Sequence, residues 1–219
     1  MTMEIKLNGN PDFGEADVHL SSGESILAEA GAMSRMSNGI ELSTKLLGGF
    51  IQAFLRKFLT KETLVMGQYQ AREAGSVALA PRYPGTVFQE SINGAGLLLT
   101  GGSLLACTDD VKVKPKFGGI RQFFSGEGAF IMECTGHGSI VMAAYGSVVE
   151  KTINGTFTVD TGHLVAWEPS LQFRIRGAGG LKQTLLSGEG LTMEFSGSGR
   201  IWLQSRNIGG MTHWLRKYC

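Results

Sequence analysis

Short apolar runs, separated by breaks that contain glycine, follow one another along most of the chain. Between Val111 and Lys116 apolar and basic residues alternate, which is the period-two pattern of a β-strand with one face in the core and one in water. The runs Val87–Ile92 and Gly101–Ala106 have strand length and end at turn residues. Short strands with turns at even spacing are typical of sandwiches and barrels. The pattern therefore predicts an all-β protein.

Glycine marks the positions where turns are expected. Asn93-Gly94 follows a strand-like run, and an Asn-Gly pair suits the two positive φ angles of a type I′ hairpin. The runs 130–133 and 140–143 flank the pair Gly136/Gly138. We therefore expect a hairpin at Asn93-Gly94 and a turn at the Gly-x-Gly pair.

One phrase, an aliphatic residue followed by Asn-Gly, occurs at Asn8-Gly9, Asn93-Gly94 and Asn154-Gly155. The last two lie 61 positions apart, and Gly136/Gly138 recurs at the same interval as Gly197/Gly199. Self-similarity at a fixed period indicates a repeat architecture. The prediction is one fused chain of three tandem β units: repeat one at 1–84, repeat two at 85–145, repeat three at 146–206 and a helical tail at 207–219.

Two segments break the β pattern. The segment 49–61 places its apolar residues on one side of a helical wheel and basic residues elsewhere, which predicts an inserted amphipathic helix. Three roles stay open for it: covering the β core, which we favour, packing against another subunit, or lying in a membrane interface. A shorter helix is expected at 211–218, with Trp214 and Leu215 docked. The residues of the apolar face of the inserted helix are Phe50, Ile51, Phe54, Leu55 and Phe58.

Composition narrows the class of protein. Hydrophobic residues make up 42% and charged residues 18% of the chain, below the roughly 25% charged residues of average soluble chains, so a sizeable core is expected. The net charge of +1 gives no overall field that attracts nucleic acid. Cys107 and Cys134 lie in apolar runs and are expected to be buried reduced thiols. With no secretory signal or membrane-length apolar run in view, a cytoplasmic location is expected.

Three segments of the chain resemble a known family. They are Gly23–Met33, Ala80–Gly85, which reads Ala-Pro-Arg-Tyr-Pro-Gly, and Gly199–Arg206. In this order they resemble the mitochondrial biogenesis family named for altered inheritance of mitochondria, and the resemblance spans about residues 3 to 216. It implies a fold like that of the trp RNA-binding attenuation protein, with three β-sandwich-like or jelly-roll-like units and pseudo-threefold symmetry. It implies no established activity for bacterial members, and a link to inner-membrane organisation for mitochondrial ones.

The phrase that follows each repeat start contains a glutamate, at Glu62, Glu127 and Glu189. If the units surround a pseudo-threefold axis, the three carboxylates would converge and bind a cation. The alternative, which we favour, is that each carboxylate accepts hydrogen bonds from backbone N–H groups of its own turn.

Basic residues recur on two expected strands, at Lys112 and Lys114 and again at Arg174 and Arg176. Such a face is a candidate for binding an anion or a nucleic-acid backbone. The first unit lacks the pair, and no aromatic residues alternate with the charges as single-strand binding favours. We therefore favour a solvated strand face.

Patterns typical of enzymes are missing from the sequence. The histidines show no zinc-ligand spacing, and neither a nucleophile elbow nor a phosphate-binding loop occurs. We expect no catalytic residue, no metal and no cofactor. The prediction is a non-enzymatic oligomeric binding or scaffold protein, with a homotrimer favoured and no nucleic-acid partner. Alternatives are a small-ligand or RNA-binding sensor, and a peripheral membrane-organising protein that uses the 49–61 helix. The histidines are His19, His137, His163 and His213.

Overall fold

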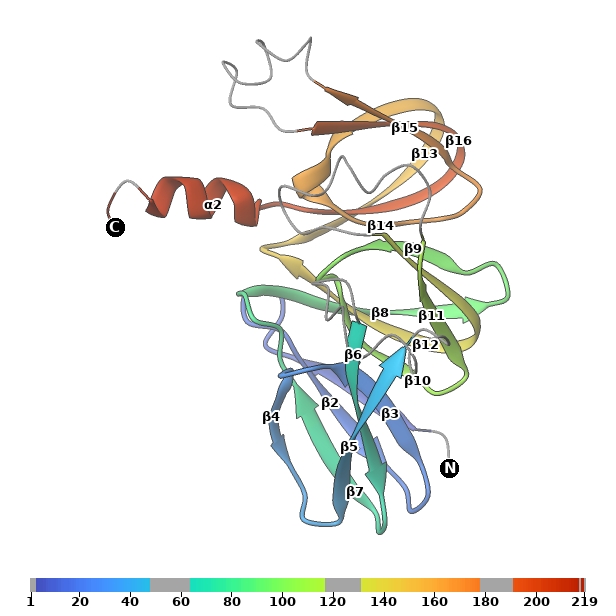
Figure 1. The fold of residues 1–219 in the computed structure, drawn as a ribbon, viewed down its shortest axis with the longest axis vertical. Coiled ribbons are helices and arrows are strands. Elements are labelled where there is room, and N and C mark those ends of the chain that lie inside the picture. The colour runs from blue at the N-terminus through green and yellow to red at the C-terminus, as the bar shows by residue number, and fades with distance from the viewer. Residues whose placement is uncertain (1–2, 48–63, 117–130, 178–190, 217, 219) are drawn as a thin grey trace, which may run out of the picture.

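A computed structural model describes residues 3–47, 64–116, 131–177, 191–216 and 218. Within these ranges the chain forms sixteen β-strands and a short C-terminal α-helix, so the expected all-β class is confirmed. The molecule is elongated, with the N-terminal strands at one end and the strands β13 to β16 at the other (Figure 1).

A four-stranded antiparallel sheet forms one face of the N-terminal end. In its second strand Ala16, Val18 and Leu20 are buried, while the residues between them are half-exposed. This alternation places every second side chain in the core, as the pleat of a strand requires. The strands, in spatial order, are β1 (Glu4–Asn8), β2 (Glu15–Leu20), β7 (Gly75–Leu79) and β4 (Met33–Met36).

The other strands form one larger sheet of 12 strands that runs the length of the molecule (Figure 1). Its main path is β13 (Val148–Asp160), β16 (Leu191–Gln204), β14 (Leu164–Trp167), β9 (Leu97–Thr100), β12 (Ile131–Tyr145), β10 (Leu104–Thr108), β3 (Ser25–Glu29), β6 (Leu64–Ala71) and β5 (Ile40–Leu47). Strands β8 (Gly85–Asn93) and β11 (Val111–Pro115) pair with β12, and β15 (Gln172–Gly177) pairs with β16.

Two long strands organise this sheet. The strand β12 pairs along its second half with β8 and β10, and along its first half with β9 and β11. The strand β16 pairs with β13 over its full length, and with β14 and β15 on its other edge. The register shifts between Leu104 and Ala106 in β10, and between Leu164 and Ala166 in β14. The pairing schemes of the two long strands are therefore similar: each has partner strands on both edges, and one of these partners contains a register shift.

The prediction of a turn at each Gly-x-Gly pair is wrong. Residues Gly136 and Gly138 lie inside the continuous strand β12, and Gly197 and Gly199 lie inside β16. The partner strands of β12 change between Gly136 and His137. A Cβ on Gly136 would lie 2.3 Å from the backbone oxygen of Asp110. Glycine is needed there because another backbone approaches where the strand changes partners.

The expected hairpin at Asn93-Gly94 is also wrong. Gly94 has a φ of +90°, but among the described residues only glycines have positive φ angles, so Asn93 does not adopt a type I′ geometry. The Gly94 N–H donates to the carbonyl oxygen of Gly136 at 2.9 Å. The chain therefore continues along β12 from β8 to β9, instead of folding back on β8.

The core consists of three clusters of buried side chains along the long axis. In the N-terminal cluster Val18 and Val77 of the small sheet pack with Ile26 of the large sheet, as in a β-sandwich. The central cluster contains Cys107 and Cys134, and both are buried free thiols, as expected. The third cluster, with Trp167, Phe195 and Ile201 at its centre, fills the C-terminal end.

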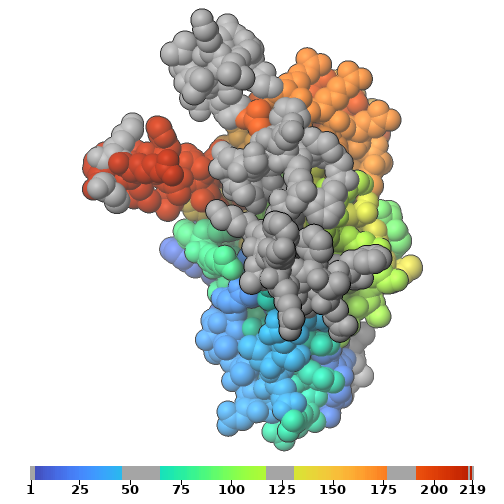
Figure 2. Space-filling model, viewed as in Figure 1, coloured from blue at the N-terminus to red at the C-terminus, as the bar shows by residue number. Residues whose placement is uncertain are grey.

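The C-terminal helix α2 covers Ile208–Leu215, three residues earlier than expected, because the Asn207 side chain caps it by accepting a hydrogen bond from the N–H of Gly210. The expected docking of Trp214 and Leu215 is wrong. Trp214 is 55% exposed, and α2 has no buried residue. The helix projects sideways from the β body, so its last turn does not reach the sheet (Figures 1 and 2).

Candidate functional site

A mainly apolar cavity, here named the Tyr83 pocket, lies where the loop between β7 and β8 meets the base of α2. Its volume is about 410 Å³. Its residues come from β3, the 80–84 loop, β10, β12 and α2, which are widely separated along the chain. The charged side chains that line it are Glu29 and Arg82. The apolar wall consists of Leu104, Leu105, Ala143, Tyr145, Ile208 and Met211.

The ring of Tyr83 is held by both polar and aromatic contacts. Its hydroxyl donates to the carbonyl oxygen of Gly102 at 2.8 Å. The ring packs edge-on to that of Tyr145, with centroids 5.8 Å apart and planes at 64°. Burial, and then the negative charge of Glu29, raises the pKa of the Tyr83 phenol, so this hydroxyl stays protonated and acts as a fixed part of the wall.

Glu29 and Arg82 form a loose ion pair at the edge of the pocket. Arg82 Nη2 lies 3.4 Å from Glu29 Oε1 and also donates to the carbonyl oxygen of Ala30 at 2.9 Å. The Glu29 side chain is 24% exposed, whereas that of Arg82 is 66% exposed. Burial raises the pKa of Glu29, and Arg82 offsets only part of this effect. The carboxylate is therefore only partly compensated by its basic neighbour.

The loop that carries Arg82 and Tyr83 is held close to β12. Two prolines, Pro81 and Pro84, restrict its backbone, and the N–H of Gly146 donates to the Pro84 carbonyl oxygen at 3.1 Å. In the sequence this loop is recognisable only as one of the three segments that carry the family resemblance. The sequence signal for a site is an arginine and a tyrosine between two prolines. The prolines make the loop rigid, and rigidly held loops often carry functional side chains.

A second, more polar hollow of about 380 Å³ lies beside the Tyr83 pocket. The two share Tyr83, Gly102 and Ile208. In the second hollow the Gln204 side chain donates to the carbonyl oxygen of Gly162 at 2.8 Å, and its other face is formed by Asn207, the cap of α2. The base of α2 therefore borders two adjoining cavities.

The predicted basic face is exposed, but its charges are partly paired. Lys112 and Lys114 point away from the core on β11, because Val111 and Val113, which alternate with them, are buried. On β15, Arg174 and Arg176 are exposed, and Arg176 forms an ion pair with Glu194 at 2.9 Å. The four side chains do not line either cavity. Anion binding on this face stays a prediction.

The other predicted site residues cannot be placed. Glu62, Glu127 and Glu189 lie outside the described residues, and so does the apolar face of the 49–61 helix. Within the described ranges, no three His, Cys, Asp or Glu side chains are grouped so as to hold a metal ion. In the same part of the chain, no helix is long and apolar enough to cross a membrane.

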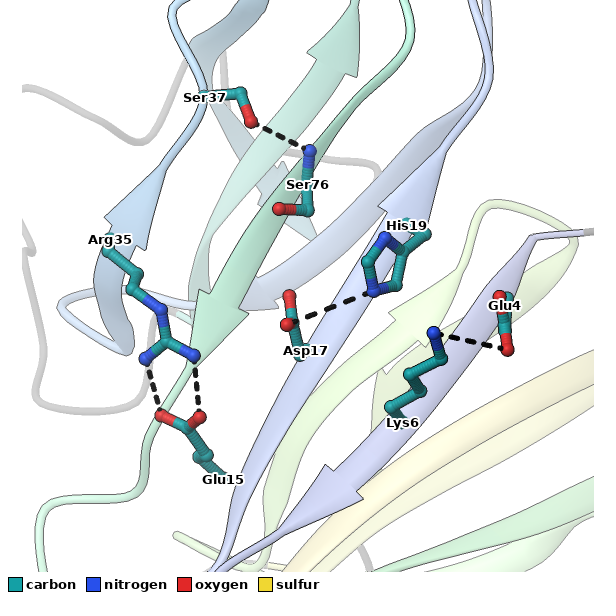
Figure 3. Close-up of polar contacts among 8 residues, drawn as sticks. All are labelled: Glu4, Lys6, Glu15, Asp17, His19, Arg35, Ser37 and Ser76. Carbon is teal, nitrogen blue, oxygen red and sulfur yellow. Dashed lines mark hydrogen bonds and ion pairs between the residues drawn. The ribbon is translucent and has the colours of Figure 1, made fainter.

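The outer face of the small sheet carries a set of polar contacts. Glu15 on β2 accepts two hydrogen bonds from the Arg35 guanidinium on β4, at 2.6 and 2.7 Å. His19 Nε2 lies 3.8 Å from Asp17 Oδ2 on the same strand. Figure 3 shows these pairs side by side on the sheet. Neither cavity is lined by them, and the Glu15–Arg35 pair links β2 to β4 across the intervening strand β7.

Comparison with known proteins agrees with the family resemblance. The model of the family described as mitochondrial biogenesis AIM24 matches residues 5–206. An uncharacterized protein of Streptococcus pyogenes serotype M6 is 28% identical over 225 residues, covering 99% of this chain and 91% of the relative. The crystal structure of a protein from Streptococcus pyogenes superposes with a TM-score of 0.85 at 29% identity and covers both chains completely.

Proposed function

The chain belongs to the mitochondrial biogenesis AIM24 family, and we propose that it is a non-enzymatic binding protein that assembles from several copies of itself. The feature that supports the proposed assembly is helix α2. Its apolar side chains are exposed, and it projects from the β body (Figure 2). Exposed apolar surface gathered on one element is typical of an interaction site. The exposed apolar residues of the tail are Ile208, Met211, Trp214, Leu215 and Tyr218.

A second copy of this chain is the partner proposed for α2. The last turn of the helix carries His213, and Arg216 follows as its cap, so the projecting end is basic as well as apolar. The Tyr83 pocket at the base of the helix presents the carboxylate of Glu29. When two copies pack around a symmetry axis, the basic end of the helix of one copy is complementary in charge to the carboxylate beside the first turn of the helix of the other.

Native mass spectrometry of the purified protein tests the assembly. We expect more than one subunit for the unmodified chain, with a trimer as the predicted state. The double variant Met211→Ser, Trp214→Ser should lower the number of subunits, while the matched control Thr212→Ser on the same helix should not. A monomer at every concentration for the unmodified chain would refute the assembly.

We further propose that the chain consists of three tandem units, as the repeated phrases predict. The schemes around β12 and β16 support two of them. Gly94 and Gly155 have φ angles of +90° and +116°, and Gly136 and Gly197 have +109° and +118°. Each pair is 61 positions apart, so the positive-φ glycines recur with the sequence period.

The Tyr83 pocket favours small-ligand binding as the second part of the function. Cavities of a few hundred Å³ that are lined by apolar residues and a few polar groups are the usual form of ligand sites. The same mass spectra report any molecule that stays bound to the purified protein.

RNA binding by the basic face and membrane contact by the 49–61 segment remain predictions. Salt-dependent RNA binding that weakens in Lys112→Ala, Arg174→Ala would support the first.

A further inference from the structure

The Tyr83 pocket combines an apolar body with acceptors of hydrogen bonds. The Tyr83 hydroxyl donates its proton to Gly102 O at 2.8 Å. The Tyr145 hydroxyl donates to Met211 Sδ. A hydroxyl that has given its proton to a protein partner offers only lone pairs to a ligand. Apart from Arg82, the side-chain polar groups of the pocket therefore accept hydrogen bonds.

The acidic group of the pocket is Glu29, and its charge is incompletely balanced. Arg82 Nη2 lies 3.4 Å from its Oε1, and that nitrogen also donates to the Ala30 carbonyl oxygen. Because Arg82 is 66% exposed, it can turn into water without a large loss of packing. A positively charged group inside the pocket would face the same carboxylate.

The two tyrosine rings add a second attraction for a cation. Tyr83 and Tyr145 both line the pocket and meet edge to face, 5.8 Å between centroids. In an edge-to-face pair, the ring that points its edge at its neighbour keeps its own π-faces free for another group. Ammonium groups bind aromatic faces within about 6 Å of the centroid, most strongly where water is excluded. The two rings and the carboxylate therefore all favour a positively charged ligand.

We propose that the Tyr83 pocket binds an amphipathic organic cation, that is, a molecule with one ammonium group and an apolar body. The ammonium group lies at Glu29 and the tyrosine rings, and the apolar body packs on Leu104, Leu105 and Ala143. This assignment rests on the ligand-binding function proposed above and names the class of ligand. Without a ligand Arg82 pairs with the Glu29 carboxylate, and the cation displaces Arg82 when it binds.

Calorimetry with probes of equal chain length tests the proposal on the full chain. Hexyltrimethylammonium and hexylamine are expected to bind, hexanol to bind at least tenfold more weakly, and hexyl sulfate most weakly. Glu29→Gln keeps the shape of the side chain but removes its charge, so it should weaken both ammonium probes at least tenfold. Glu41→Gln, an exposed carboxylate on β5 outside the pocket, is the matched control and should change nothing.

Arg82→Gln separates this proposal from the other interpretations of the pocket. If Arg82 competes with the ligand for Glu29, the variant should bind hexyltrimethylammonium more tightly than the unmodified chain does. Weaker cation binding in Arg82→Gln, or hexyl sulfate binding as tightly as the ammonium probes, overturns the cation class and leaves ligand binding in place. If none of the four probes binds, the cation class and the ligand-binding function both fail.

Discussion

Glu168 accepts two hydrogen bonds from Arg200, one from its backbone N–H at 3.0 Å and one from Nε at 2.8 Å. The same guanidinium lies 3.4 Å from Glu150 and 3.7 Å from Glu90, and its carbon lies 4.7 Å from the centroid of the Trp202 ring. One arginine on β16 therefore joins carboxylates of β8, β13 and the loop after β14, where the middle and the C-terminal strands meet.

Arg200→Gln is expected to lower the free energy of unfolding at pH 7. The side chain is 40% exposed, so solvent screening limits the loss to about 1 kcal/mol, as for ion pairs that form a network. Without Arg200, the carboxylates Glu90, Glu150 and Glu168 repel one another. The loss is measured by urea denaturation of the variant and the unmodified chain.

The same loss should shrink at low pH. Burial raises the pKa of Glu90, and the charges of Glu150 and Glu168 raise it further, while Arg200 lowers it. As pH falls through the raised pKa of Glu90, this carboxylate becomes neutral, so the removed cation matters less. A loss that is as large at pH 4 as at pH 7 would contradict this account of the cluster.

Glu29→Gln is expected to make the protein more stable at pH 7. Burial raises the pKa of Glu29 in the folded chain above its ordinary value of 4.5, so the folded state holds the proton more tightly than the unfolded state does. The stability that this proton contributes is fully present below pH 4.5 and is lost as pH rises through the folded pKa. Glutamine does not titrate, so the advantage of the variant should grow across this window and then level off.

Urea denaturation at several pH values between 4 and 8 measures the difference. Other titrating groups are common to both proteins and cancel. An advantage that is constant over this range would show that Arg82 fully offsets the effect of burial on Glu29, and one that falls as pH rises would show that Arg82 outweighs it.

Alternation along a single strand could be predicted from the sequence. Val111 and Val113 are buried on β11, and Lys112 and Lys114 are exposed, because the pleat assigns successive side chains to opposite faces. This relation depends only on neighbours in the chain. The strand therefore appears where the pattern predicts it.

The role of Gly136 and Gly138 could not be predicted in the same way. Turn propensity is a local property, and two glycines next to strand-like runs satisfy it. In the structure the groups that require glycine come from β10 and the turn after it: Asp110 O approaches Gly136, and the Thr108 hydroxyl approaches Gly138. The contacts that decide the conformation are thus long-range, and the sequence shows only the glycines.

The Tyr83 pocket could not be predicted for a similar reason. Glu29, Tyr83 and Tyr145 are far apart in sequence, and they meet only because β3, β10 and β12 lie next to one another in the large sheet. The sequence shows a rigid loop with Arg82 and Tyr83. It does not show the strands that complete the site.

The thiols of Cys107 and Cys134 are expected to be unreactive in the folded protein. Burial raises the pKa of both, that of Cys134 to about 12, so little thiolate forms at pH 8, and the thiolate is the reactive species. In a Cys219→Ser background, a thiol-reactive disulfide reagent should label both cysteines only after denaturant unfolds the chain. Rapid labelling in native buffer would contradict the burial of these side chains.

Gly136→Ala should destabilise the protein more than Gly197→Ala, although the two glycines are 61 positions apart and have similar φ angles of +109° and +118°. Both variants carry backbone strain of about 1–3 kcal/mol, because alanine rarely adopts such angles. At Gly136 the new Cβ would also lie 2.3 Å from Asp110 O, whereas at Gly197 the nearest atom, Ser170 O, is 3.4 Å away. The difference between the two free energies of unfolding, measured by urea denaturation, therefore isolates the backbone contact from the strain, and equal losses would mean that the contact relaxes without cost.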